Sequence, residues 1–150
     1  MEKKVITKRI FVALVGIIML ACVPNSIAET FRGEFCWQVF NQGGEPYWRY
    51  KFGVYQKEGG YFALFGSVDY ENTLSAAHGN AVVVGDSVKL TIVSSDREEG
   101  LEFWTETFAA QLNPSTLNGT WNAIEFVKRD GENDVFGIHQ QGTINLVACQ

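Results

Sequence analysis

The sequence predicts an all-β protein, built as an eight-stranded antiparallel up-and-down barrel. Three observations lead to this prediction. Apolar and polar residues alternate with a period of two along short successive segments, and clusters of Gly, Pro, Asn and Asp separate these segments. No segment carries a sustained stripe with the 3.6-residue period of a helix. A two-sheet β-sandwich is the competing architecture.

Eight segments have the length and the alternation of strands. In the first, the alternation places Phe31, Phe35 and Trp37 on one face and Arg32 and Cys36 on the other. The longest interruption spans residues 71–79, within which residues 74–77 are expected to form a helical turn or a flap. The expected strands cover residues 31–40, 47–56, 61–70, 80–84, 87–95, 101–112, 117–128 and 136–149.

An eight-stranded sheet is well suited to closure. A closed barrel of this size has an interior that side chains or one small ligand can fill, and closure removes exposed strand edges. An even number of strands brings the first and last strands together in antiparallel order. Glycines within the segments are suited to the sharp bends of a small barrel; they are Gly33, Gly53, Gly66, Gly119 and Gly142.

The first 28 residues have the pattern of an export signal. Four basic residues lie within residues 1–9, and an uncharged stretch of 14 residues, 10–23, follows. This stretch is shorter than the roughly 20 residues that span a bilayer. Ser26 and Ala28 supply small residues for signal peptidase. We therefore expect a signal peptide over 1–28, a single domain over 29–150, and a periplasmic or secreted protein.

A lipid anchor is the alternative to cleavage after Ala28. Residues 19–22, Met-Leu-Ala-Cys, resemble a lipobox, in which Cys22 would be acylated. Met and Leu fit poorly at the outer positions of that motif. Cleavage after Ala28 removes Cys22 and leaves Cys36 and Cys149. A pair of cysteines in an exported domain predicts one disulfide, here joining the start of the mature chain to its end.

Charge and the chain terminus exclude two classes of protein. From Glu29 onward there are 8 basic and 16 acidic side chains, a net charge of −8, so phosphate backbones would be repelled and no nucleic-acid partner is expected. The chain ends in Val-Ala-Cys-Gln, without the terminal aromatic residue usual in outer-membrane barrels. We therefore expect a domain that is not embedded in the membrane.

No catalytic or metal-binding constellation is recognisable. The two histidines are His78, in the expected loop, and His139, on the last segment, and no Gly-x-Ser-x-Gly motif is present. Zinc usually needs three or four His or Cys ligands. Residues 130–134 resemble the start of a calcium loop, but Val135 and Gln141 stand where Gly and Glu are required. We expect no enzyme activity, no metal and no cofactor.

The closest approach to a carboxylate pair is Glu102 with Glu106. Four residues along a strand span roughly 13 Å, which exceeds the separation of the two carboxylates in glycosidases. We therefore expect both side chains to face water beside a Lys or Arg of a neighbouring strand.

Aromatic residues are the strongest indication of a binding site. They make up 13% of the chain and are spread over different expected strands. The wider set of residues that could line a cavity also includes Tyr61, Phe65 and Gln111. If the aromatic side chains line a cavity they can stack on a flat or apolar ligand, and if they do not, they fill the barrel. The candidate pocket residues are Trp37, Trp48, Tyr50, Trp104, Trp121 and Gln140.

Residues 117–121, Leu-Asn-Gly-Thr-Trp, resemble a motif of the calycin-like barrels, the lipocalin and avidin types. Those barrels often carry Gly-x-Trp at the start of a strand, and here Gly119 and Trp121 match it. In lipocalins the motif lies near the N-terminus, whereas here it opens the seventh segment. The resemblance implies a small barrel with the indole packed against its floor, and it implies no particular ligand.

These observations favour a non-enzymatic exported barrel that binds a small apolar or amphipathic ligand. This function predicts a cavity of several hundred Å³. The alternative is a protein-binding barrel, such as an inhibitor of a secreted protease or lysozyme. It predicts a filled interior and function in loops such as residues 71–79 or 96–100. An acidic surface would suit a basic target.

Overall fold

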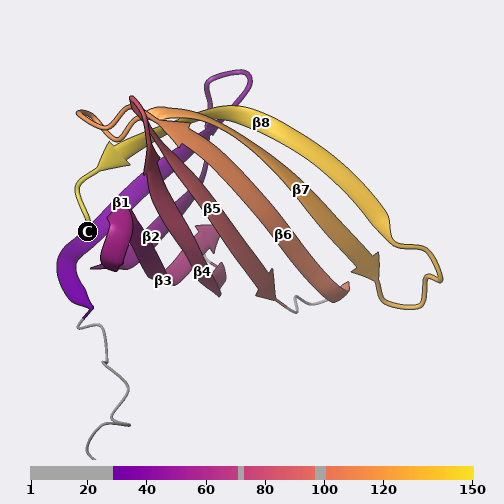
Figure 1. Ribbon diagram of the computed structural model, residues 1–150. Helices are drawn as coiled ribbons and strands as arrows, with labels where there is room; N and C mark the ends of the chain where they lie inside the picture. Colours follow the sequence, from indigo (N-terminus) through magenta and orange to yellow (C-terminus); the bar gives the residue numbers. More distant parts are fainter. Residues whose placement is uncertain (1–28, 71–72, 97–100) are drawn as a thin grey trace, which may run out of the picture.

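The computed structural model describes residues 29–70, 73–96 and 101–150 (Figure 1). Within them, consecutive strands pair in antiparallel order and the last strand pairs with the first, which confirms the predicted closed up-and-down barrel. The strands are β1 (Thr30–Asn41), β2 (Pro46–Gln56), β3 (Tyr61–Tyr70), β4 (Thr73–Val84), β5 (Ser87–Asp96), β6 (Leu101–Leu112), β7 (Gly119–Arg129) and β8 (Phe136–Val147), with the 3₁₀ turn η1 (Glu58–Gly60) between β2 and β3.

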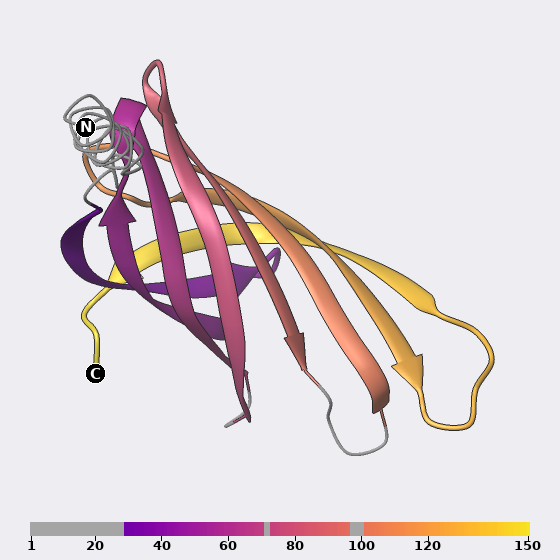
Figure 2. The same cartoon turned by 60° about the horizontal axis from the view of Figure 1, so that its bottom comes forward.

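The barrel has two ends, which we name the mouth and the base. At the mouth β1, β3, β5 and β7 end, and β2, β4, β6 and β8 begin. The base carries η1, the connections β4–β5 and β6–β7, and the end of β8. The β7–β8 loop lies at the right-hand edge of the barrel in both views (Figures 1 and 2). The expected signal peptide, 1–28, and the alternative lipid site at Cys22 lie outside the described residues. In the described part of the chain, no helix has the length and apolar character needed to cross a bilayer.

The fourth strand is longer than the sequence predicts. β4 begins at Thr73 and includes residues 74–77, which were expected to form a helical turn or a flap. Ser75 and Ala77 are buried inside the barrel, whereas Leu74 is exposed. The inward residues of this strand are small because bulky aromatic side chains from other strands occupy the interior. The usual alternation of large apolar and polar residues is therefore missing, although the strand is regular.

A bulge in β1 reverses the expected facing of its first residues. Gly33 has a φ of 125°, and the register with β2 shifts between Phe31 and Gly33. Phe31 consequently lies outside, 54% exposed, with its ring 5.2 Å from the ring of Tyr55. Arg32, expected on the outer face, instead lines the base of the barrel. A bulge of this kind redirects a side chain without ending the strand.

A layer of aromatic side chains fills the middle of the barrel. The ring of Phe108 stacks on Trp121 at 5.3 Å and meets Tyr50 at 5.2 Å, and Tyr50 stacks on Phe52. The indole of Trp121 donates a hydrogen bond to the carbonyl of Phe40, so its polar atom is satisfied inside the core. We call these residues the aromatic layer: Trp48, Tyr50, Phe52, Phe108 and Trp121.

Several strand glycines lie where the neighbouring backbone approaches too closely for a side chain. A Cβ at Gly79 would lie 2.2 Å from the carbonyl oxygen of Thr91, and one at Gly119 would lie 1.9 Å from that of Gln111. Gly66 and Gly142 have equally close neighbours. Gly53 differs, because its nearest neighbour is a side-chain atom at 3.4 Å. At Gly66, Gly79, Gly119 and Gly142 the strands can therefore coil strongly, which lets eight strands close into a narrow barrel.

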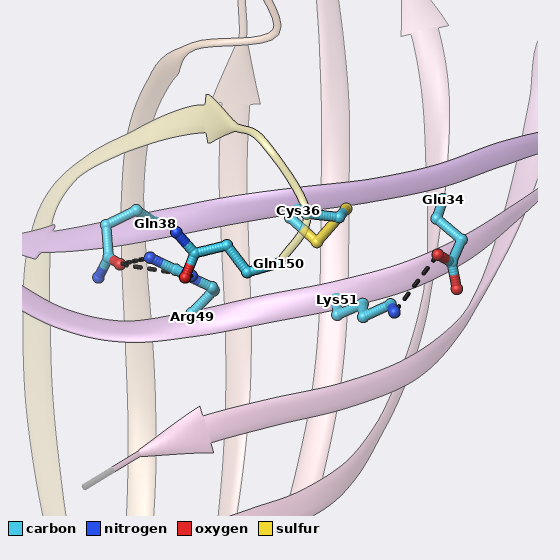
Figure 3. The surroundings of a disulfide bond; sticks show 7 residues. Glu34, Cys36, Gln38, Arg49, Lys51 and Gln150 are labelled. Carbon is cyan, nitrogen blue, oxygen red and sulfur yellow. Dashed lines mark hydrogen bonds and ion pairs between the residues drawn. A yellow bond between two sulfur atoms is a disulfide. The ribbon is translucent and has the colours of Figure 1, made fainter. Parts of the chain in front are cut away.

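The predicted disulfide joins Cys36 to Cys149 across the seam between β1 and β8 (Figure 3). Cys36 pairs in register with Val147, two residues before Cys149, and the two cysteine Cα atoms are 5.2 Å apart. Although Cys36 belongs to the outer face of β1, it is only 1% exposed. The bond therefore fixes the chain end against the first strand at the place where the barrel closes.

The first prediction concerns this disulfide. Its loop has a sequence separation of 113 residues. Loop-closure entropy for such a loop amounts to about 4–5 kcal/mol, and measured effects are commonly 2–4. Replacing both cysteines by serine should lower the free energy of unfolding in urea by about 2–4 kcal/mol. The oxidised protein should lose the same amount when reductant is added. A smaller loss than 1 kcal/mol would show that strand pairing alone holds the seam.

The second prediction compares two strand glycines. Gly79→Ala should lower the free energy of unfolding by more than about 2 kcal/mol, because the new Cβ collides with backbone that cannot move independently. Gly53→Ala is the matched control and should be neutral or slightly stabilising, because space is present and alanine loses less backbone entropy. Chemical denaturation of both variants measures the difference, and equal effects would contradict the close approach.

Candidate functional sites

The aromatic layer separates two recesses of different chemistry. The base basin is a recess of about 420 Å³ with almost entirely apolar walls, and the mouth cavity, at the opposite end, measures about 90 Å³. The mouth cavity is lined by Tyr47, Trp48, Val68, Tyr70, Ser75, Trp104, Glu106, Glu125 and Gln140. The base basin is lined by Arg32, Phe35, Trp37, Val54, Phe62, Leu64, Ala81, Val83, Val88, Leu90, Leu112, Pro114 and Leu117.

Glu106 in β6 is a buried carboxylate at the mouth cavity. It is 2% exposed, so the expectation that it faces water is wrong. The hydroxyl of Tyr50 donates a hydrogen bond to its Oε1 at 2.6 Å, and the hydroxyl of Ser94 donates to the same oxygen at 3.3 Å. Glu106 lies on the inner face of β6, together with Trp104 two residues before it and Phe108 two residues after it. The side chain of Glu102, its expected companion, lies outside the described residues.

Burial raises the pKa of Glu106 to about 7, because the charged carboxylate is poorly solvated there. The negative charge of Glu125 raises this pKa further, whereas the hydrogen bonds from Tyr50 and Ser94 lower it. The pKa of Tyr50 is raised well above its ordinary value, first by burial and then by the charge of Glu106. Tyr50 therefore stays protonated and serves Glu106 as a hydrogen-bond donor.

Glu125 in β7 is a second carboxylate at the same cavity, and it was not among the residues predicted from the sequence. It is the direct register partner of Glu106. Trp104 donates its indole hydrogen bond to Oε1 of Glu125, and Gln140 donates to Oε2 at 2.8 Å. Two carboxylates directly opposite each other on neighbouring strands repel. Trp121, Ala123 and Glu125 follow one another at a spacing of two and therefore share one face of β7. This spacing was the available signal that Glu125 points inward.

Three aromatic side chains form the opposite wall of the mouth cavity. The ring of Tyr47 lies 4.4 Å from that of Trp48 and 5.6 Å, edge to face, from that of Tyr70, and Trp48 and Tyr70 are 6.4 Å apart. Trp48 is 6% exposed, and its buried Nε1–H makes no hydrogen bond of regular geometry among the described residues. The indole nevertheless lies beside the Tyr50 hydroxyl and lowers the pKa of Tyr50, so this donor is directed into the aromatic layer.

The base basin has a single charged side chain in its lining. Arg32 is brought to this end by the Gly33 bulge, and its Nε donates a hydrogen bond to Oε1 of Gln56 at 2.7 Å. Trp37 forms part of the wall, and its own Nε1–H is satisfied by the carbonyl of Leu117 at 3.0 Å. The remaining lining is aliphatic or aromatic, so the basin presents one cation beside an apolar surface.

The structure distributes the predicted pocket residues over three places. Trp48, Trp104 and Gln140 line the mouth cavity, and Trp37 lines the base basin. Tyr50 and Trp121 lie in the aromatic layer between the two recesses. The wider set lies on the outer surface, because Tyr61 and Phe65 are each 56% exposed and Gln111 accepts a hydrogen bond from Lys89.

The remaining chemistry-bearing residues are dispersed. His78 lies within β4 rather than in a loop, and both His78 and His139 are exposed. Among the described residues, no three His, Cys, Asp or Glu side chains are grouped as metal ligands would be. Residues 130–135 form the loop between β7 and β8, where the hydrogen bond from Glu132 N to the carbonyl of Arg129 makes a turn.

Comparisons of the chain with protein-family models, with curated proteins and with solved structures gave no match.

The third prediction follows from the raised pKa of Glu106. The folded state holds this proton more tightly than the unfolded state, for which the pKa is 4.5. The stabilising contribution is therefore fully present below pH 4.5 and is lost as the pH rises through about 7. The loss amounts to about 3 kcal/mol.

Urea unfolding between pH 4.5 and 8 tests this dependence. Glu106→Gln should remove most of the decline and should make the protein more stable than the wild type at pH 8. Glu45→Gln, at an exposed glutamate in the β1–β2 turn, is the control and should keep the decline. An unchanged pH profile in Glu106→Gln would show that the carboxylate is well solvated.

Proposed function

We propose that the protein is an exported, non-enzymatic binding barrel whose base basin takes a single-chain anionic amphiphile, a fatty-acid-like carboxylate. The observation that carries this proposal is the pairing of a large apolar recess with one cation at its wall. The basin measures about 420 Å³, the size expected for a small-molecule site. The resemblance to calycin-like barrels agrees with this type of function, and the disulfide is typical of an oxidising compartment.

The apolar walls would supply most of the affinity. Each buried methylene group contributes roughly 0.8 kcal/mol, so eight methylenes contribute about 6 kcal/mol before the costs of association. The wall residues come from several strands, among them Phe62 and Leu64 of β3 and Leu90 of β5. Because these strands are rigidly paired, the recess is formed in advance and little ordering is needed on binding.

Arg32 would supply the specificity for an anionic head group. Its guanidinium group offers several donors in one plane, which suits a carboxylate. The Gln56 side chain holds the guanidinium group through Oε1, an acceptor that leaves the charge of Arg32 unneutralised. The nearby Lys51 and Lys57 instead form ion pairs with Glu34 and Glu29, at 3.3 and 2.9 Å.

The fourth prediction tests this site with dodecanoate as the probe, below its micelle concentration. Titration should change the tryptophan fluorescence of the wild type, and Trp37→Phe should remove most of that change. Arg32→Gln should weaken dodecanoate binding by about tenfold, the loss of one exposed charge-assisted contact. It should leave binding of the uncharged analogue dodecanol unchanged.

A matched variant at the other end of the barrel controls for indirect effects. Trp104→Phe alters the mouth cavity and should leave dodecanoate affinity unchanged. If dodecanoate does not bind, or if Arg32→Gln weakens dodecanol and dodecanoate equally, the assignment of the base basin is wrong.

A second candidate function, binding of a protein target, is favoured by a different feature. β8 pairs with β1 only from Gly142 to Val147, because β1 ends at Asn41. Residues 136–141 therefore pair with β7 alone among the described residues, which leaves a strand edge at the mouth. Phe136 and Ile138 on this segment are 47% and 44% exposed. An open edge with exposed apolar residues can accept a strand from a partner.

The fifth prediction distinguishes this candidate. A proline at Gln141 or His139 removes a backbone donor from the edge segment of β8 and should weaken a protein partner that adds a strand there. Inhibition of a basic lysozyme or of a trypsin-like protease provides the assay. Dodecanoate binding at the base should be unchanged in both variants. Absence of inhibition by the wild type leaves the ligand-binding proposal as the sole candidate.

A further inference from the structure

We propose that the mouth cavity is a second binding site, which takes a small alkylated ammonium ion. It lies on the opposite side of the aromatic layer from the base basin, and it does not depend on the function proposed for that basin. The proposal combines three features of one cavity: two carboxylates that are direct register partners, an aromatic wall and a lining without a basic side chain.

The carboxylates make the cavity suited to a cation. Glu106 and Glu125 are direct register partners and both line the cavity. The lining contains no basic side chain, so no group of the described lining neutralises them. Asp96 lies close by as well, since Ser75 in the lining donates a hydrogen bond to its Oδ2. A bound cation would relieve the repulsion between the glutamates, which otherwise only a proton at Glu106 relieves.

The aromatic wall favours an alkylated ammonium ion over a metal ion. Tyr47, Trp48 and Tyr70 contact one another, and Trp104 closes the cavity from β6. The faces of such rings attract organic cations, and aromatic cages of this kind bind quaternary ammonium groups. A metal ion would require several oxygen ligands in regular geometry, whereas both Glu125 oxygens already accept hydrogen bonds from Trp104 and Gln140.

The size of the cavity limits the ligand to a small ion. The cavity measures about 90 Å³, so it can hold only a few heavy atoms. Trp48 contributes its ring to the wall, whereas its Nε1–H is fully buried beside the Tyr50 hydroxyl and does not face the cavity. These requirements together describe a small alkylated ammonium ion that lies between the glutamates and the rings.

The probe for the experiment is choline, and its uncharged isostere 3,3-dimethylbutan-1-ol is the matched control ligand. Calorimetric titration of the full-length domain at pH 8 should detect choline and should show the isostere binding at least tenfold more weakly. Tetramethylammonium, which keeps the cationic methyl groups and lacks the hydroxyl group, should bind about as tightly as choline. Phosphocholine should also bind at least tenfold more weakly, because its phosphate would enter a cavity lined by carboxylates.

Two variants locate the site. Glu125→Gln and Trp104→Leu should each weaken choline binding by about tenfold or more, since one removes a charge and the other a ring. Arg32→Gln, at the base basin, should leave choline binding unchanged and so separates this proposal from the function proposed for the other end. Circular dichroism spectra that match the wild type show that the variants are folded.

Two further readouts separate a binding role of the cavity from a structural one. In ¹⁵N-labelled protein the indole N–H resonance of Trp48 should shift on addition of choline. Choline affinity should fall by about tenfold from pH 8 to 5.5 as Glu106 takes up its proton, and Glu106→Gln should remove that dependence. The other titratable groups facing the cavity are Glu125, Tyr47 and Tyr70, with Asp96 behind Ser75.

The opposing results are equally specific. Equal binding of choline and its isostere, or no binding of choline to the wild type at millimolar concentration, would overturn the proposal and assign the cavity to ordered water. Choline binding that Glu125→Gln and Trp104→Leu leave intact would also overturn it, because the cation would then bind elsewhere. No binding of tetramethylammonium at millimolar concentration would also overturn it, because the proposed contacts involve only the charge and the methyl groups.

Discussion

Closure of the sheet between β1 and β8 is the constraint on which the rest of the structure depends. Six residues of β1, from Cys36 to Asn41, pair with β8, and the Cys36–Cys149 disulfide holds the chain end against the same seam. Without this closure the sheet would have two long edges and no enclosed interior. The aromatic side chains of β2, β6 and β7 would then lack partners across the barrel. The two recesses exist because these rings meet in the middle and leave both ends unfilled.

The two ends differ in chemistry because inward positions near each end carry different residues. Towards the base the inward side chains are chiefly aliphatic, with Arg32 as the one charge in the lining. Towards the mouth they include Glu106 and Glu125, whose mutual repulsion and poor solvation oppose folding at neutral pH. The two carboxylates accept hydrogen bonds from Tyr50, Ser94, Trp104 and Gln140, which offset only part of this cost. Destabilising groups of this kind are commonly retained for binding or catalysis.

Much of the fold was predictable, because its signals are local or depend only on whether the number of strands is even. The alternation along β2, β3 and β5 marks strands within ten residues, and an even number of strands places the first beside the last. The pairing of Cys36 with Cys149 follows from the same parity together with the small number of cysteines. β4 was only partly predictable, since Ser75, Ala77 and Gly79 are small where an inward face usually carries large side chains. The signal was weak because size complementarity is a property of the whole interior.

From the sequence alone, the all-β class, the eight-stranded closed barrel and the disulfide were determined, because alternation, turn residues and strand parity are written along the chain. Tertiary structure alone decided the sites. Register across β6 and β7 sets Glu106 beside Glu125, although 19 positions separate them in the chain. A one-residue bulge at Gly33 moves Arg32 from the outer face to the base basin. Both depend on which residue of one strand lies opposite which residue of the next, and no local pattern specifies that register.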